Sequence, residues 1–88
     1  MGYDAPKTIS TLTTTPIRLT DLPLGAAARL HEARLNEATR QRLASLGLID
    51  RCQLWLCKTG EPCIVRVRST RIGFSRAVAE QIFVVPER

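Results

Sequence analysis

The feature that most constrains the fold of this chain is a pair of alternating runs joined by a short connection. Residues 52–57 read CQLWLC and residues 63–68 read CIVRVR, so that every second residue of each run is apolar. A period of two is that of a β-strand with one buried face. The connection at 58–62, KTGEP, holds the glycine and proline that are typical of turns. The two runs therefore predict a β-hairpin.

The same alternation fixes the expected register of the hairpin. Leu54 and Leu56 share a buried face with Val65 and Val67 only if the numbers of paired residues sum to an odd value. A shift by one residue would bury the charged Arg66 instead.

The three cysteines take different places in this register. Cys52 and Cys63 fall on the buried face, where a free cysteine packs as a small apolar residue. Cys57 falls on the outer face and does not lie opposite Cys63, because their numbers sum to an even value. An odd cysteine count with no secretory signal argues against a disulfide framework and predicts a cytoplasmic protein.

Trp55 is out of phase with the apolar residues of its run and is expected on the outer face, beside Ile64 and Arg66. Tryptophan and arginine are favoured interface anchors, and arginine stacks on an indole ring. The alternative is that Trp55 is covered by the N-terminal residues or by a helix over 36–46. The expected partner-binding residues are Trp55, Ile64, Arg66, Arg68 and Arg40.

The segment before the hairpin predicts one strand and one helix. Residues 26–35, AAARLHEARL, alternate like a half-buried strand. Asn36 is a favourable N-cap, and Gly47 followed by Leu48 suits a left-handed C-cap that closes a Schellman motif. The buried stripe of this helix is expected to be Thr39, Leu43 and Leu46.

Short elements account for the rest of the chain. Thr20 or Asp21 is expected to cap a single helical turn, and Ser75 another, with strands over 71–74 and 82–85. The whole predicts a mainly β fold with short helices, a small, partly open SH3-like β-barrel. An OB-like barrel is the alternative.

The chain has 88 residues, which is enough for one small domain. Residues 1–16 differ from the rest, because KTISTLTTTP at 7–16 is rich in threonine and lacks a sustained period. We expect a mobile Thr-rich tail over 1–16 and a barrel domain over 17–88. No apolar run is long enough to span a membrane.

Charge composition bounds the class of partner. Thirteen basic residues against eight acidic ones give a net charge of +5, which suits nucleic acid, an acidic protein surface or an anionic membrane face. The arginines are spread over several elements and stacking aromatics are few, so no nucleic-acid partner is expected.

The residues give little support for catalysis. The chain has a single histidine, no paired carboxylates at a suggestive spacing and no glycine-rich phosphate loop, so we expect no enzyme. We expect no obligatory cofactor. His31 and Cys57 both point outward, and with Glu32 or Glu37 they form a candidate site for zinc or ferrous iron, either on the surface of one chain or bridging two chains.

Three segments together resemble the FeoA family, ferrous iron transport protein A. They are LTDLPLG (19–25), RQRLASLGL (40–48) and GEPCIVRVRSTRIGFSRAVAEQIFV (60–84), and their order and spacing carry the resemblance over residues 17–85. The same domain type is similar to the C-terminal module of iron-dependent repressors. Ile49, Asp50 and Arg51 stand where the family often has Pro-Gly.

The resemblance implies an SH3-like barrel in the bacterial cytoplasm, peripheral to the inner membrane. It also implies a partner, the cytoplasmic region of the FeoB transporter, and an accessory or regulatory role in ferrous iron uptake without enzyme activity. The alternatives are an iron- or zinc-responsive regulator that dimerises through bridging metal, and a nucleic-acid-binding barrel.

Overall fold

The computed structural model describes residues 15–87. The expected tail over 1–16 therefore lies outside the described residues, except for its last two positions. The elements are β1 (Ile17–Arg18), η1 (Leu19–Asp21), β2 (Ala27–Ala33), α2 (Glu37–Ser45), β3 (Gln53–Lys58), β4 (Cys63–Val67), β5 (Thr70–Phe74), α3 (Arg76–Ala79) and β6 (Ile82–Pro86).

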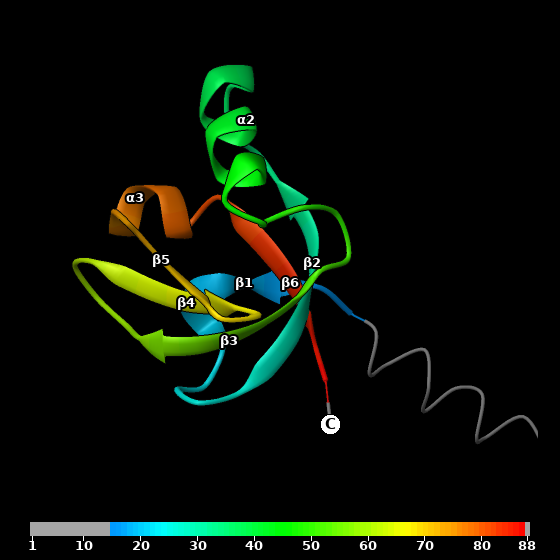
Figure 1. Ribbon diagram of the computed structural model, residues 1–88. Helices are drawn as coiled ribbons and strands as arrows, with labels where there is room; N and C mark the ends of the chain where they lie inside the picture. Colours follow the sequence, from blue (N-terminus) through cyan, green and yellow to red (C-terminus); the bar gives the residue numbers. More distant parts are fainter. Residues whose placement is uncertain (1–14, 88) are drawn as a thin grey trace, which may run out of the picture.

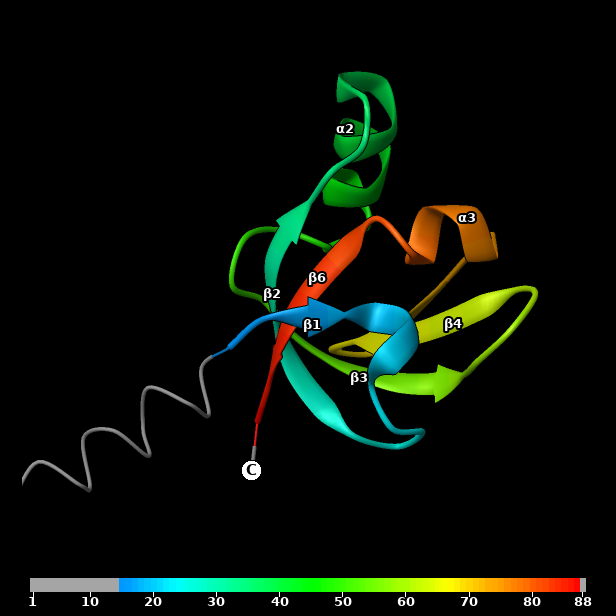
Figure 2. The same ribbon diagram turned by 180° about the vertical axis from the view of Figure 1, so that it is seen from behind.

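The strands form one antiparallel sheet in the order β1-β6-β2-β3-β4-β5 (Figure 1). The view from behind shows how this sheet curls, so that β1 and β6 face β3 and β4 across the core (Figure 2). Within the described residues, the end strands β1 and β5 do not pair with each other. The expected mainly β, partly open barrel with short helices is therefore confirmed.

The β3–β4 hairpin has the expected register. Trp55 pairs with Arg66 and Leu56 pairs with Val65, so the residue numbers sum to an odd value. Beyond this point the register shifts, because Cys57 is an extra residue in β3 and Lys58 pairs with Ile64. Such a β-bulge alters which face the following residue occupies.

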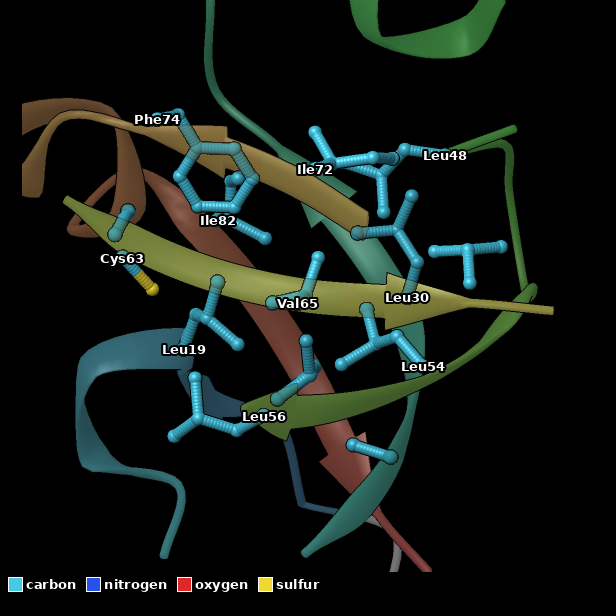
Figure 3. Packing of buried hydrophobic residues seen from close by; sticks show 14 of the residues in the cluster. Leu19, Leu30, Leu48, Leu54, Leu56, Cys63, Val65, Ile72, Phe74 and Ile82 are labelled. Carbon is cyan, nitrogen blue, oxygen red and sulfur yellow. The ribbon is translucent and has the colours of Figure 1, made fainter. Parts of the chain in front are cut away.

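The core lies inside this curled sheet, where side chains from all the longer strands meet (Figure 3). Leu54, Val65, Ile82 and Val84 are fully buried. Burying an aliphatic side chain of this size contributes about 1.5–3 kcal/mol relative to leaving it exposed. The other fully buried residues, at 0–1% exposure, are Leu19, Ala28, Leu56 and Ala79.

Helix α2 has the expected ends. The Asn36 side chain accepts a hydrogen bond from the Thr39 amide at 2.8 Å. At the other end Gly47 has a φ of 110°, and the Leu48 amide donates to the Leu43 carbonyl at 3.0 Å. With the bond from the Gly47 amide to the Ala44 carbonyl, this is a Schellman motif.

The expected buried stripe of α2 is wrong at Leu46, which is 46% exposed. Leu43 is buried and Thr39 half-buried, as expected. Leu46 is the C-cap, and the left-handed turn at Gly47 then reverses the chain. Leu48 therefore takes the core position that periodic spacing assigned to Leu46.

The first helical turn also differs from expectation. It covers Leu19–Asp21, and its N-cap is Arg18 with no side-chain hydrogen bond, so neither Thr20 nor Asp21 caps it. What holds the turn is the buried Leu19. The cap expected at Ser75 is present, since its hydroxyl accepts from the Val78 amide at 3.2 Å.

The turn after α2 places an arginine in a left-handed conformation. The Cys52 amide donates to the Ile49 carbonyl at 3.0 Å, which closes a β-turn, and Arg51 has a φ of 64°. A non-glycine residue rarely adopts this conformation, which costs roughly 1–2 kcal/mol. The backbone of Arg51 still makes two contacts, to the Leu30 carbonyl and from the Arg29 guanidinium.

We predict that Arg51→Gly raises the free energy of unfolding by about 0.5–1 kcal/mol, because glycine removes the strain and keeps both backbone contacts. The measurement is urea denaturation. Arg42→Gly is the matched control: Arg42 is also an exposed arginine, but it lies inside α2, where glycine costs about 1 kcal/mol. A loss of stability in both variants would contradict the account of this turn.

Candidate partner-binding surface

A cross-strand row of side chains runs over the outer face of the sheet from β2 to the end strand β5. The register places Ala27 of β2, Trp55 of β3, Arg66 of β4 and Arg71 of β5 opposite one another in turn. The Arg66 guanidinium lies over the Trp55 ring, 4.5 Å from its centroid. Its Nη1 also donates to the Arg68 carbonyl at 3.3 Å. Arg66 is thus held in place before any partner arrives.

A second row lies beside the first, towards the β3–β4 turn. It consists of Lys58, Ile64 and Gly73, which the register places opposite one another. Lys58 reaches this face because of the bulge at Cys57. Ile64 is half-buried and Gly73 adds no side chain, so part of the Ile64 surface stays open.

These rows, together with Arg68 in the turn after β4, make a surface that we call the outer basic face, made of Trp55, Lys58, Ile64, Arg66, Arg68 and Arg71. Residues 53–74 hold four basic side chains and one acidic side chain. The acidic one, Glu61, accepts a hydrogen bond from the Arg76 backbone at 2.7 Å, in the turn between β3 and β4. Between residues 15 and 87, no carboxylate forms an ion pair with any of the four basic residues.

Four basic residues elsewhere are paired with carboxylates. Ion pairs join Arg34 to Glu32 at 3.3 Å, Arg40 to Glu37 at 2.8 Å, Arg76 to Glu80 at 3.4 Å, and Arg29 to Glu87. A hydrogen bond from Gln53 and the nearby Arg29 lower the pKa of Glu87, so it stays ionised.

Arg66 and Arg71 are directly opposite on neighbouring strands, and like charges in such a pair are destabilising. Seven basic side chains within residues 15–87 lack an ion pair, and four of them lie on the outer basic face, which suits an anionic partner.

The structure divides the residues that the sequence predicted for this surface. Trp55, Ile64 and Arg66 lie on the β3–β4 hairpin, and Arg68 stands in the turn that follows β4. Arg66 lies opposite Trp55 as expected, whereas the residue opposite Ile64 on β3 is Lys58. Arg40 lies on α2, where it pairs with Glu37 and lines a different hollow of about 290 Å³.

Sequence reasoning missed Arg71 and Lys58. The sequence pattern could have identified Arg71, because Arg71 alternates with the buried Ile72. It could not have identified Lys58, because the side of the sheet that Lys58 occupies depends on the bulge at Cys57.

The candidate metal donors are separated by the fold. Ala27 pairs with Trp55, so the positions of His31 and Cys57 differ by six residues along the β2–β3 ladder. This separation is roughly 20 Å of strand length. Because two ligands of one zinc ion lie within about 4 Å of each other, His31 and Cys57 of the same chain cannot share an ion. A site that joins His31 of one copy to Cys57 of another stays a prediction.

The acidic candidates are already engaged. Glu32 pairs with Arg34 and Glu37 pairs with Arg40. The hydrogen bond from Arg40, and then that from Gln41, lowers the pKa of Glu37. Over residues 15–87, no three side chains of the histidine, cysteine, aspartate and glutamate types gather into a metal-binding group.

The three thiols differ in environment. Burial raises the pKa of Cys63 and of Cys52, so both stay protonated at neutral pH. Cys57 is exposed in the bulge of β3. Because the thiolate is the reactive form and needs access to the reagent, Cys57 is the thiol open to modification.

We predict that one thiol of the three reacts rapidly with a maleimide at neutral pH under native conditions. Cys57→Ser should abolish the rapid phase, whereas Cys63→Ser should leave it unchanged. The phases are resolved by mass spectrometry over time. A rapid phase that survives Cys57→Ser would show that Cys52 or Cys63 is also accessible to the reagent, and would contradict this assignment.

No helix within residues 15–87 is long and apolar enough to cross a membrane. The fold is that of a small, partly open β-barrel domain, and its sheet carries an exposed basic surface. The model of the family described as "FeoA domain" matches residues 17–86, and the chain belongs to this family. No protein among the curated sequences compared matches the chain.

Solved structures agree with this family. The FeoA protein of Chlorobium tepidum superposes with a TM-score of 0.77 at 27% identity, covering 82% of this chain and 71% of that one. FeoA of Stenotrophomonas maltophilia, crystallised with zinc, gives a TM-score of 0.68 at 27% identity, covering 82% of this chain and 96% of that one. The latter is described as an SH3 domain protein, so the expected SH3-like fold is confirmed.

The structure of T. acidophilum IdeR is similar in fold alone. Its TM-score is 0.75 at 22% identity, and the match covers 83% of this chain and 35% of IdeR. The FeoA family is associated with ferrous iron transport as a small accessory domain and is not a known enzyme family.

Proposed function

We propose that this protein is an accessory, regulatory component of bacterial ferrous iron uptake, which docks on the cytoplasmic part of the FeoB transporter through the outer basic face. The observation that carries the proposal is the outer basic face, whose four basic side chains form no ion pair within residues 15–87, in a domain of a ferrous iron transport family. The related S. maltophilia protein is described as a candidate ferrous iron transport activating factor.

The Trp55–Arg66 pair supplies a preorganised anchor for such a contact. An arginine that is already stacked on tryptophan and bonded to a carbonyl loses little conformational freedom when it binds a carboxylate. Buried tryptophan and arginine side chains carry a large share of the binding energy at protein interfaces.

Regulation would follow from differential affinity. If the face binds one conformation of the transporter more tightly than another, it shifts the population towards that conformation. A tenfold difference in affinity corresponds to about 1.4 kcal/mol. The site of action is cytoplasmic and beside the inner leaflet, whose anionic lipids attract a basic surface.

We predict that Trp55→Ala and Arg66→Ala each weaken binding to the cytoplasmic region of FeoB at least tenfold, because each change removes half of the anchor. Affinity is measured by calorimetry at two salt concentrations. The matched control is Arg42→Ala, which removes from α2 an exposed arginine that forms no ion pair with any described residue.

Folding must be checked in parallel, since Trp55 is half-buried. Loss of the stacked pair should lower the free energy of unfolding by about 0.5–1 kcal/mol and leave the fold intact. Unchanged affinity in both folded variants, or an equal loss in Arg42→Ala, would contradict docking through this face.

A second candidate function is favoured by the zinc in the S. maltophilia crystal. In it, zinc or ferrous iron bridges His31 of one copy and Cys57 of another, giving a metal-responsive dimer. Both donors are exposed and both lie in bulges, outside the regular ladder.

For this candidate, sedimentation should show a dimer with zinc and a monomer with chelator. His31→Ala should stay monomeric in both conditions because one bridging donor is missing. Gln41→Ala, an exposed position on α2, serves as the control. A zinc-dependent dimer that persists in His31→Ala would reject the bridge.

A further inference from the structure

β5 ends the sheet and has a free edge. It pairs with β4 on one side, and within the described part of the chain no strand pairs with its other side. In an antiparallel pair every second residue directs its N–H and C=O away from the partner strand. Thr70, Arg71 and Gly73 are exposed along this edge. An edge of this kind is a template for another extended chain.

Gly73 stands in the middle of this edge without a structural reason. Its φ is outside the left-handed region, so the backbone does not require glycine. A Cβ there would meet Ile64 Cγ1 at 3.8 Å and the Cys63 carbonyl oxygen at 4.0 Å, which are ordinary contacts. Glycine weakens a strand interior, and it often marks a place where another backbone or a ligand approaches closely.

The charge beside Gly73 identifies the kind of chain that fits. Arg71 lies two residues away on the same face, directly opposite the stacked Arg66. Neither guanidinium is paired to a carboxylate among residues 15–87. A carboxylate placed between them would relieve their repulsion and accept from both.

We propose that the β5 edge accepts an extended acidic segment of a protein partner as an additional strand. Its aspartate or glutamate faces Arg71 and Arg66, and a bulky apolar residue two positions along covers Gly73 and the open side of Ile64. The spacing of two follows from strand alternation. This inference rests on the proposed function, because it gives the way in which the outer basic face holds its partner.

A second copy of this chain fits the edge less well. Pairing β5 with β5 would add another Arg71 to a face that already holds two unpaired guanidinium groups. The positive charge alone would also attract nucleic acid. A phosphate backbone, however, does not pair with the free edge of a strand as a peptide does, and it does not fill the gap above Gly73. These occupants are outcomes of the test.

The probe is a blocked seven-residue peptide, Thr-Glu-Thr-Glu-Thr-Phe-Thr, together with its reversed sequence. We expect the full chain to bind at least one of them, with the outward-directed amides of β5 protected from hydrogen exchange. Two methylated forms of the peptide are compared, one methylated at the backbone nitrogens of the Glu and Phe residues and the other at those of the Thr residues. Only one of the two forms should lose binding, because only one edge of an added strand forms hydrogen bonds with β5. Lysine in place of glutamate should abolish binding.

Two variants test the residues. Arg71→Glu should weaken peptide binding at least tenfold, whereas Arg42→Glu on α2 should not change it. The Gly73→Val variant should be at least as stable as the unchanged protein. The unchanged protein should bind the peptide with Phe more tightly than the same peptide with Ala, and Gly73→Val should remove this difference. Peptide binding without protection of β5 amides would overturn the proposal, as would displacement of the peptide by RNA of equal charge or a dimer formed through β5.

Retention of the cytoplasmic region of FeoB is scored separately. If the peptide adds to β5 and FeoB is not retained, the proposed partner is wrong and the strand-addition site stands. If FeoB is retained and the β5 amides stay unprotected with both FeoB and peptide, strand addition is wrong and the proposed function stands.

Discussion

The pairing register of β3 and β4 is the constraint on which the rest of the structure depends. With Trp55 opposite Arg66, the leucines of β3 and the valines of β4 are buried together. The same pairing necessarily puts Trp55, Ile64 and Arg66 on the outside. A slip of one residue would bury Arg66 and expose Val65 and Val67, at a cost of several kcal/mol. One pairing register thus determines both the core residues and the candidate surface residues. A change of register that altered the surface would also disrupt the core.

The distribution of charge gives the outer side of the sheet a preference for acidic partners. Within residues 15–87, four arginines on other elements are paired with a carboxylate, whereas those on β4 and β5 are not. Surface ion pairs contribute little to stability, so their absence here costs the fold little. What it leaves is an uncompensated positive field above a tryptophan. Such a field speeds encounter with an acidic partner and selects against basic ones.

The sequence predicted what depends on period and capping. The hairpin register, the Asn36 cap, the Schellman motif at Gly47 and the contact of Trp55 with Arg66 are all confirmed. It did not predict features that arise where a period is interrupted. The bulge at Cys57 moved Lys58 to the outer face, and the reversal at Gly47 exposed Leu46.

The distance between residues on different strands could not be predicted from the sequence either. Alternation placed His31 and Cys57 outward, but only the β2–β3 pairing shows that they lie at different ends of the ladder. The central claim is that the outer basic face is the docking surface, and amide hydrogen exchange of the intact protein with the cytoplasmic region of FeoB tests it most directly. Docking through this face predicts protection centred on β3, β4 and β5. Protection confined to α2 and its hollow, or no protection in a complex shown to form, would contradict it.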